Sequence, residues 1–219
     1  MTGHPFTEKA VNYAVNNIDR FSFGLHFNIV DGHPPLSKKC KSLTDKDNVF
    51  EKSSIQRIKA LTFRISPDDV ADELDAQLSC LMEMGLKVTH VDSHGHLHKF
   101  PIVIKSMMPV LRKFKINRVR YPQSIYQKTN ISRQLLNAYC QYFFKSIKHP
   151  ENSYFLSDHA DKNWLIDFLR NLPEGTTELG IHPGRVDEWR IAETAPFLVD
   201  SLLDVMRLGD INLISYSEI

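Results

Sequence analysis

The sequence has few cysteines, no long apolar run and no signal-peptide pattern, and each of these absences excludes a class of protein. It has three cysteines, Cys40, Cys80 and Cys140, which lie far apart and form no Cys-x-x-Cys pair. This pattern argues against a disulfide framework and against a zinc site built from thiolates. No apolar run approaches the roughly 20 residues that span a bilayer, and the N-terminal stretch MTGHPFTEKA lacks the apolar core of a signal peptide. We therefore expect a soluble, cytoplasmic protein with no membrane partner.

An excess of charge of one sign is absent as well. The 27 basic side chains are balanced by 26 acidic ones, which leaves a formal net charge of +1. A chain balanced in this way produces no positive field that would attract nucleic acid, so we expect no nucleic-acid partner. Its 219 residues, of which 42% are hydrophobic, are enough for a globular domain with its own core. We expect residues 1–219 to form a single domain with a loop insertion at about 31–66.

Short apolar strands alternate with amphipathic helices along the chain. The clearest helix begins at Ser66, a favourable N-cap followed by proline, and ends at Gly85. Alternation of strands and helices predicts an α/β fold with parallel strands and helices packed outside. We expect a barrel because the polar face of Ser22–Ile29 carries small groups and one histidine, which suits a barrel interior close to a site. The predicted strands are 22–29, 87–92, 117–121, 177–182 and 211–216, and the predicted helices are 6–17, 66–85, 101–115, 131–147, 158–171 and 194–208.

The histidines are unusually concentrated in one stretch of the sequence. Four of the 10 histidines fall within nine residues, at His90, His94, His96 and His98. Even-numbered residues of a strand share a face, so His90, Asp92 and His94 are expected to point one way. Imidazole and carboxylate groups together suit a divalent cation. Any one of these histidines alone is better explained as a core residue, but the cluster predicts a metal or catalytic site.

Four residues outside the cluster are further candidates. His26 is the one histidine of an otherwise apolar strand, where a histidine is usually structural, but its place near the end of an inward-facing row would let it meet His94 across the barrel. His182 ends a strand and is followed by Pro-Gly, which suits a general acid or base, although a turn residue that caps the next helix fits equally well. Arg120 could orient a carboxylate or the substrate, or simply pack at a strand end. Trp189 could stack on a sugar ring, or pack at the rim.

Five blocks carry a resemblance to a known family. They are Gly24-Leu-His-Phe-Asn28, Gly32-x-Pro-Pro-Leu36, Thr89-His-Val-Asp-Ser-His-Gly-His-Leu-His98 with Phe100-Pro101, Ile181-His-Pro-Gly184 and Ser215-Tyr-Ser-Glu218. In content, order and spacing they resemble the YdjC-like carbohydrate deacetylases, which include the chitooligosaccharide deacetylases. The central histidine string is highly specific, and the resemblance extends over nearly all of the chain.

This resemblance implies a fold, a reaction and a set of site residues. The family fold is a distorted (β/α) TIM-like barrel, and its members remove acetyl groups from N-acetylated mono- or oligosaccharides. The reaction uses a divalent metal, usually Mg²⁺, with Zn²⁺ or another transition metal as the alternative. His26 and His94 match the two histidine ligands, and His182 matches a late histidine that protonates the leaving amine. The predicted catalytic residues are therefore His182 and Asp92, and the residues expected to support the ligands or face the substrate are His96, His98, Arg120 and Trp189.

One family block has no counterpart in this sequence. Family members begin with a strand that ends in Asn-Ala-Asp-Asp-Phe-Gly and supplies an aspartate ligand and a catalytic base. Here the pair Asp68-Asp69 opens a helix and is followed by Val-Ala. We therefore expect a barrel that lacks about one βαβ unit at its N-terminal end. Such a chain would bind metal weakly and have low activity, and its unpaired strand edge would favour a homodimer.

Two other functions compete with a deacetylase. The first is a catalytically inactive sugar-binding relative that keeps the barrel. The second is another metal-dependent hydrolase that acts on esters or phosphates.

Overall fold

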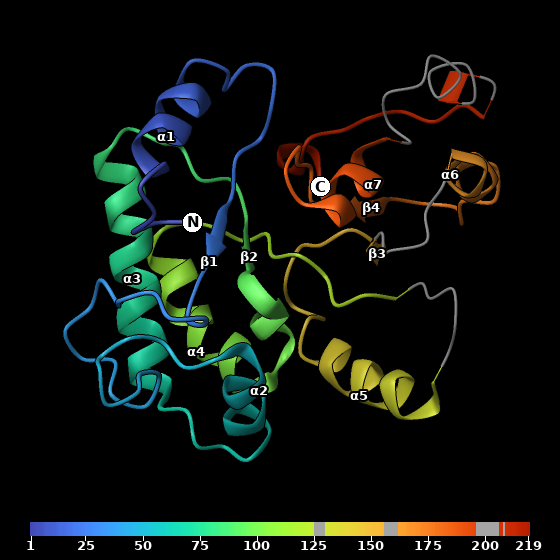
Figure 1. The fold of residues 1–219 in the computed structure, drawn as a ribbon. Helices are drawn as coiled ribbons and strands as arrows, with labels where there is room; N and C mark the ends of the chain where they lie inside the picture. The colour runs from blue at the N-terminus through green and yellow to red at the C-terminus, as the bar shows by residue number, and fades with distance from the viewer. Residues whose placement is uncertain (125–129, 156–161, 196–205, 208) are drawn as a thin grey trace. The chain divides into compact units, whose positions relative to one another are not determined.

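The computed structural model describes residues 1–124, 130–155, 162–195, 206–207 and 209–219 (Figure 1). It divides into two compact units. The first consists of 1–122, 131–149 and 215–219, and the second of 123–130 and 150–214. Helices and parallel strands occur in both units, so the α/β class is confirmed. The single domain expected from the sequence stays a prediction.

Two short parallel strands organise the first unit. Strand β1 (Leu25–Phe27) pairs with β2 (Val91–Ser93), and this register places His26 opposite Asp92. Single parallel bridges join Val91 to Val119 and Arg118 to Lys148, which extends the parallel arrangement beyond the two strands. The predicted strands at 22–29 and 87–92 thus correspond to the shorter β1 and β2, whereas 117–121 forms only isolated bridges. The register of β1 and β2 alone brings two site residues side by side.

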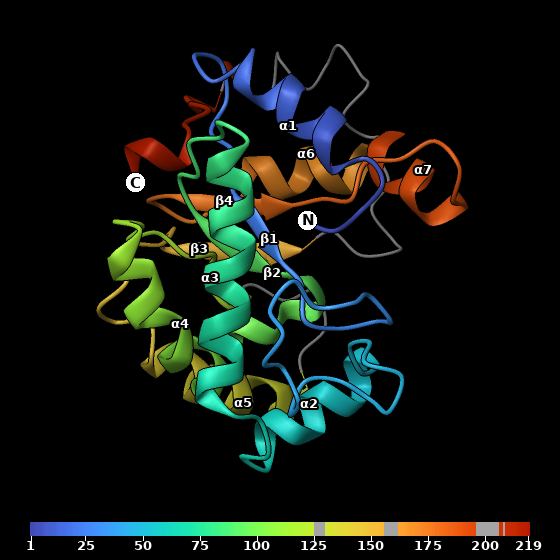
Figure 2. The same cartoon turned by 90° about the vertical axis from the view of Figure 1, so that its left-hand side faces the viewer.

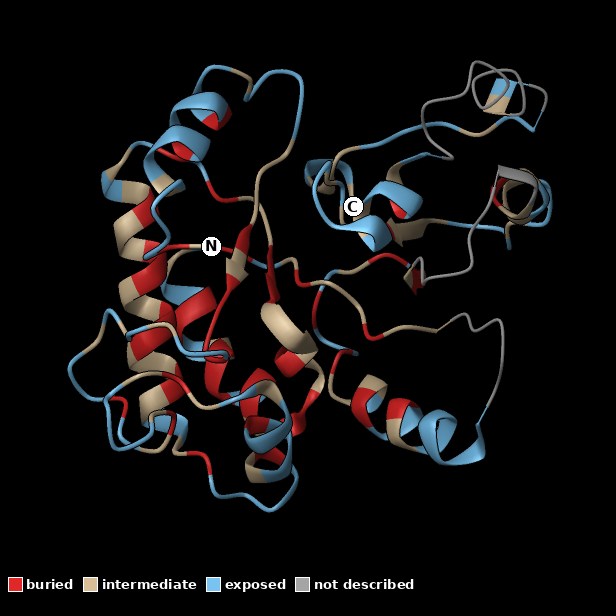
Figure 3. Cartoon of the chain, in the orientation of Figure 1, coloured by how far each residue is buried: buried red, intermediate tan, exposed pale blue. Residues whose placement is uncertain are grey.

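Two long helices cover these strands. The predicted helix after Ser66 is α3 (Pro67–Glu83), and the Ser66 hydroxyl accepts a hydrogen bond from the Asp69 amide, as its N-cap role predicts. Helix α4 (Pro101–Lys113) lies beside α3, and α3 also contacts β1 (Figure 2). Both helices carry buried residues along one face, drawn red in Figure 3. The buried stripe of α3 includes Val70, Leu74, Leu78 and Leu81.

Shorter elements complete the two units. The first also contains α1 (Thr7–Val15), α2 (Ser53–Leu61), α5 (Ile131–Tyr142) and the 3₁₀ helices η1 (His94–Lys99) and η3 (Tyr216–Glu218). The second contains β3 (Asn152–Phe155) and β4 (Thr177–Gly180), which pair in parallel, with α6 (Lys162–Arg170) and α7 (Glu188–Thr194). Helix α2 lies inside the stretch expected to be a loop, and β3 was not expected at all.

The C-terminal elements differ from the sequence prediction. The strand expected at 211–216 is wrong, because residues 211–215 have no regular structure and η3 follows them. The Ser215 hydroxyl accepts the Ser217 amide hydrogen, and the Glu218 carboxylate accepts that of Ser215, so this end is capped as the start of a helical turn. Most of the helix expected at 194–208 lies outside the described residues, and so does 158–161 of the helix that the structure begins at Lys162.

Barrel closure is not shown. The described strands form two separate two-stranded sheets, β1 with β2 and β3 with β4. The barrel, whether complete or lacking a unit, therefore stays a prediction. None of the helices in the described ranges has both the length and the apolar character needed to cross a bilayer.

The residue before β1 gives a testable stability prediction. A Cβ at Gly24 would collide with Nε2 of His90. The His90 ring cannot easily yield, because it stacks on Tyr216 with 3.9 Å between ring centroids and its Nδ1 lies 2.9 Å from the Thr89 hydroxyl. We expect Gly24→Ala to lower the free energy of unfolding by about 1–3 kcal/mol, measured by urea denaturation.

The control for this prediction is the same substitution in a His90→Ala background. Removing the imidazole removes the collision, so Gly24→Ala should cost much less there. Equal costs in the two backgrounds would show that the ring does not impose the requirement for glycine.

Candidate active site

A pair of facing imidazoles lies where β1 and β2 run side by side. His26 is the central residue of β1, and His94 begins η1 directly after β2. Nε2 of His26 lies 3.3 Å from Nδ1 of His94, and the two rings meet edge to face. The structure therefore brings together the two histidines that the sequence predicted as ligands.

A carboxylate lies at the other nitrogen of each ring. Nδ1 of His26 is hydrogen-bonded to Oδ1 of Asp92 at 2.8 Å, and Nε2 of His94 lies 3.3 Å from Oδ2 of Asp31. A carboxylate favours a proton on the imidazole nitrogen that faces it. The two nitrogens that face each other are then the ones that carry lone pairs. A cation between them, or one shared proton, would stabilise this arrangement.

The pair fits two positions of a metal site. Metal–nitrogen distances of about 2.0–2.1 Å and tetrahedral angles place two ligand atoms about 3.3–3.4 Å apart. Within the part of the chain that the structure describes, however, no group of three or more His, Cys, Asp or Glu side chains could hold an ion. The described residues thus supply two facing imidazoles but no complete metal site of these residue types.

The Asp92 carboxylate is held by two partners, His26 and Arg120. It is buried, and its second oxygen lies 2.6 Å from Nη1 of Arg120, which follows the bridge at Val119. Burial opposes ionisation, but the hydrogen bond from His26 and the charge of Arg120 outweigh it and hold the pKa of Asp92 well below its usual range. A carboxylate in this state suits the orientation of His26 better than it suits proton transfer, so the catalytic role of Asp92 stays a prediction.

Two of the remaining histidines of the cluster, His96 and His98, lie in the turn after β2, whereas His90 directly precedes β2. His98 is fully buried with Nδ1 2.7 Å from the Ser93 hydroxyl, and burial lowers the pKa of His98 well below its usual value. His96 has a left-handed backbone, and burial together with nearby positive charge lowers its pKa to about 3. Burial also lowers the pKa of His90 to about 4. The cluster therefore carries little positive charge at neutral pH.

His182 in the second unit also has a carboxylate partner. It follows β4, its backbone N–H donates to Oε2 of Glu193 at 2.7 Å, and its Nδ1 lies 3.2 Å from the same oxygen. Glu193 is buried on α7, and the Trp189 ring meets the imidazole edge to face. Glu193 thus fixes the ring and leaves Nε2 for acid–base chemistry.

Sequence reasoning missed two of these carboxylates. Glu193 lies 11 residues beyond its partner His182, on another element, and no local pattern joins them. Asp31 stands in an Asp-Gly pair that predicts a turn, but a turn signal does not say where the side chain points.

A family model described as YdjC-like protein matches residues 1–215. The chain belongs to the YdjC-like family. Membership explains why the histidine blocks at 24–28, 89–98 and 181–184 occur together in one sequence.

Curated YdjC-like relatives share its sequence over part of their length. A carbohydrate deacetylase of Brevibacillus brevis is 33% identical over 45% of this chain and 37% of its own length. One of Thermoanaerobacter pseudethanolicus is 25% identical over 76% of this chain and 61% of its own length. The chain therefore spans less than two thirds of either relative.

A crystal structure supports the fold. It is that of an Enterococcus faecalis V583 protein provisionally named as a cellobiose-phosphate cleavage protein, and its TM-score to this chain is 0.75. The match covers 99% of this chain and 84% of that one at 18% identity, so it supports the fold alone.

Proposed function

We propose that this chain is a metal-dependent deacetylase that hydrolyses the acetamide group of N-acetylated sugars of the N-acetylglucosamine or chitooligosaccharide type. The observation that carries the proposal is the pair of facing nitrogens of His26 and His94, each ring having a carboxylate at its other nitrogen. Relatives named carbohydrate deacetylase within the same family support the reaction type.

His26 and His94 would hold the ion. The sequence resemblance implies Mg²⁺, whereas two imidazoles are ligands that Zn²⁺ and other transition ions prefer, so both kinds of ion are tested below. When bound, a divalent cation supplies Lewis-acid chemistry at the acetyl carbonyl. Asp92 and Arg120 keep the proton of His26 on Nδ1 and hold Nε2 toward His94.

The other site residues receive roles in proton transfer and sugar binding. His182, held by Glu193, is assigned the proton donation to the leaving amine, because an amine leaves poorly without a proton. Trp189 offers an aromatic face for a sugar ring, and His96 and His98 shape the turn that follows β2.

The decisive experiment measures acetate release from N-acetylglucosamine oligomers. The ion-free chain is assayed with Mg²⁺, Mn²⁺ or Zn²⁺ added, beside His26→Gln and the exposed surface variant Lys39→Met. We expect a low rate that needs an added ion, is abolished by chelator and by His26→Gln, and is unchanged in Lys39→Met. Release that survives both chelator and His26→Gln would overturn the proposal.

The same assay separates the two competing functions. Oligosaccharide binding without acetate release under any of the three ions would favour a sugar-binding relative. Cleavage of an ester or phosphate panel in place of the acetamide would favour another metal-dependent hydrolase. Either result would overturn the deacetylase proposal.

A further inference from the structure

Asp31 occupies a fixed and unusual place in the turn after β1. Its φ of 61° lies in the left-handed region, which most residues avoid and Asp and Asn tolerate best. The turn is closed by backbone hydrogen bonds from Asp31 N to Glu51 O and from Gly32 N to Phe50 O, both 2.9 Å. The position of this side chain is therefore set by the backbone on both sides of the 31–52 loop.

The Asp31 carboxylate joins two elements. Oδ1 accepts the backbone N–H of Ser53 at 2.9 Å, and Ser53 is the first residue of α2. Oδ2 lies 3.3 Å from Nε2 of His94. A negative charge at a helix N-terminus is favourable, so the first contact holds the carboxylate in place for the second.

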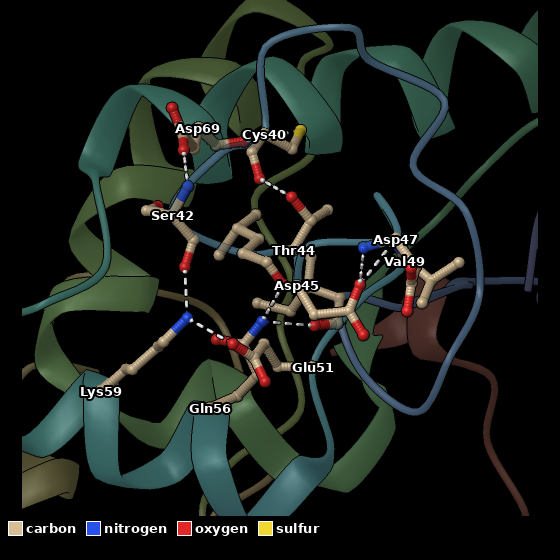
Figure 4. A network of polar contacts seen from close by, with 12 residues as sticks. Cys40, Ser42, Thr44, Asp45, Asp47, Val49, Glu51, Gln56, Lys59 and Asp69 are labelled. Atoms are coloured by element: carbon tan, nitrogen blue, oxygen red, sulfur yellow. Dashed lines mark hydrogen bonds and ion pairs between the residues drawn. The ribbon is translucent and has the colours of Figure 1, made fainter.

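Helix α2 is itself tied to the surrounding chain. The buried Gln56 side chain donates to Ile29 O at 3.0 Å and to Leu43 O at 2.6 Å. Lys59 binds Ser42 O and the Glu51 carboxylate, and these contacts hold the loop against the helix (Figure 4).

The same helix also holds the turn that carries His94. The Arg57 guanidinium donates to Gly95 O at 2.9 Å, directly beside His94. Helix α2 therefore binds both the Asp31 carboxylate and the backbone of the residue that follows His94.

We propose that Asp31 is the positioning residue of His94. Its carboxylate keeps the imidazole proton on Nε2, and Nδ1 is thereby the bare nitrogen that faces His26. The consequence for metal binding rests on the proposed function, but the tautomer of His94 is a property of the ion-free protein.

Asp31→Asn reverses this preference with little change in shape. Asparagine tolerates the left-handed backbone, and its amide oxygen can still accept the Ser53 N–H. Its NH₂ group then faces Nε2 of His94, which favours a bare Nε2 and a proton on Nδ1.

Asp45→Asn is the matched control. Asp45 lines the same cavity of about 840 Å³ as Asp31, and it accepts the amide hydrogens of Asp47 and Val49. An asparagine oxygen can accept both. This variant removes the same charge from the same cavity wall, and no hydrogen bond or ion pair described for Asp45 involves His94.

The test reads the His94 tautomer by nitrogen-15 NMR of the imidazole in the ion-free protein. The spectra are recorded at about pH 8, above the ordinary imidazole pKa of about 6.5, so that the neutral ring is observed. We expect the proton on Nε2 in the unsubstituted chain and in Asp45→Asn, and a population shifted toward Nδ1 in Asp31→Asn. A tautomer that is the same in all three proteins would overturn the proposal.

Zn²⁺ titration calorimetry supplies the second measurement. Asp31→Asn is expected to weaken binding about 10–100-fold, the usual effect of losing the partner of a ligating histidine. Asp45→Asn should bind as the unsubstituted chain does. A tautomer shift without acetate release in any protein would support the Asp31 assignment and reject the deacetylase, so the two failures are distinguishable.

Discussion

Replacing His182 by glutamine is expected to lower kcat for acetate release about 10²–10⁴-fold, with a much smaller change in KM. The Glu193 carboxylate occupies the Nδ1 side of the ring, so in the proposed reaction Nε2 is the nitrogen that would give a proton to the leaving amine. Glutamine keeps a polar side chain at this position but carries no titratable proton. The measurement is the initial rate of acetate release over a range of N-acetylglucosamine oligomer concentrations.

The variant Glu193→Gln tests whether His182 acts in proton transfer or only stabilises the fold. Its amide oxygen can still accept the His182 backbone N–H, which the native oxygen accepts at 2.7 Å, but the negative charge at Nδ1 is lost. We expect a smaller loss of kcat than in His182→Gln and the same unfolding midpoint. An unchanged kcat in His182→Gln would remove this histidine from the reaction.

Elements with strong local signals could be predicted from the sequence. Helix α3 has an N-cap, a proline at its first position and an apolar stripe, and each of these acts within a few residues. Strand β1 alternates apolar and polar residues, and the structure buries Leu25 and Phe27 while His26 points to the other face. Local chemistry and tertiary packing agree at these places.

Elements whose buried face is polar were missed. The apolar residues Ile55, Ile58 and Leu61 of α2 are exposed, whereas its buried positions are Gln56 and Ala60, and the Gln56 side chain holds the helix by hydrogen bonds. Strand β3 begins with Asn152 and Ser153, and the burial of Ser153 depends on its place in the fold. Such elements depend on contacts that form only after the chain has folded.

The candidate site also contains one part that could be predicted from the sequence and one part that could not. The pairing of His26 with His94 could be anticipated, because His26 lies near the end of one predicted strand and His94 follows the end of another. The role of Asp31 could not, because it depends on where α2 begins relative to the turn after β1. Supporting carboxylates lie on other elements than the histidines they orient, so their spacing in sequence carries no signal.

Removing the charge of Arg120 is expected to destabilise the first unit more than any surface substitution. Arg120→Met would leave the buried Asp92 carboxylate with its His26 hydrogen bond but without the guanidinium, at a cost of about 3 kcal/mol in the free energy of unfolding. Lys39→Met is the control, because the Lys39–Asp72 pair spans 4.0 Å with side chains 80% and 43% exposed. Breaking it should cost less than about 1 kcal/mol. Urea denaturation at neutral pH measures both.

The pH dependence of this cost tests its cause. Because the folded pKa of Asp92 lies below its unfolded value of about 3.9, the ionised carboxylate contributes stability above that value. This contribution is lost as the pH falls toward the folded pKa. Without Arg120 the folded pKa rises toward the unfolded one, so the variant has less of this stability to lose in acid. The difference between the two proteins should therefore narrow as the pH is lowered from neutral to about 3, whereas a difference in packing alone would stay constant.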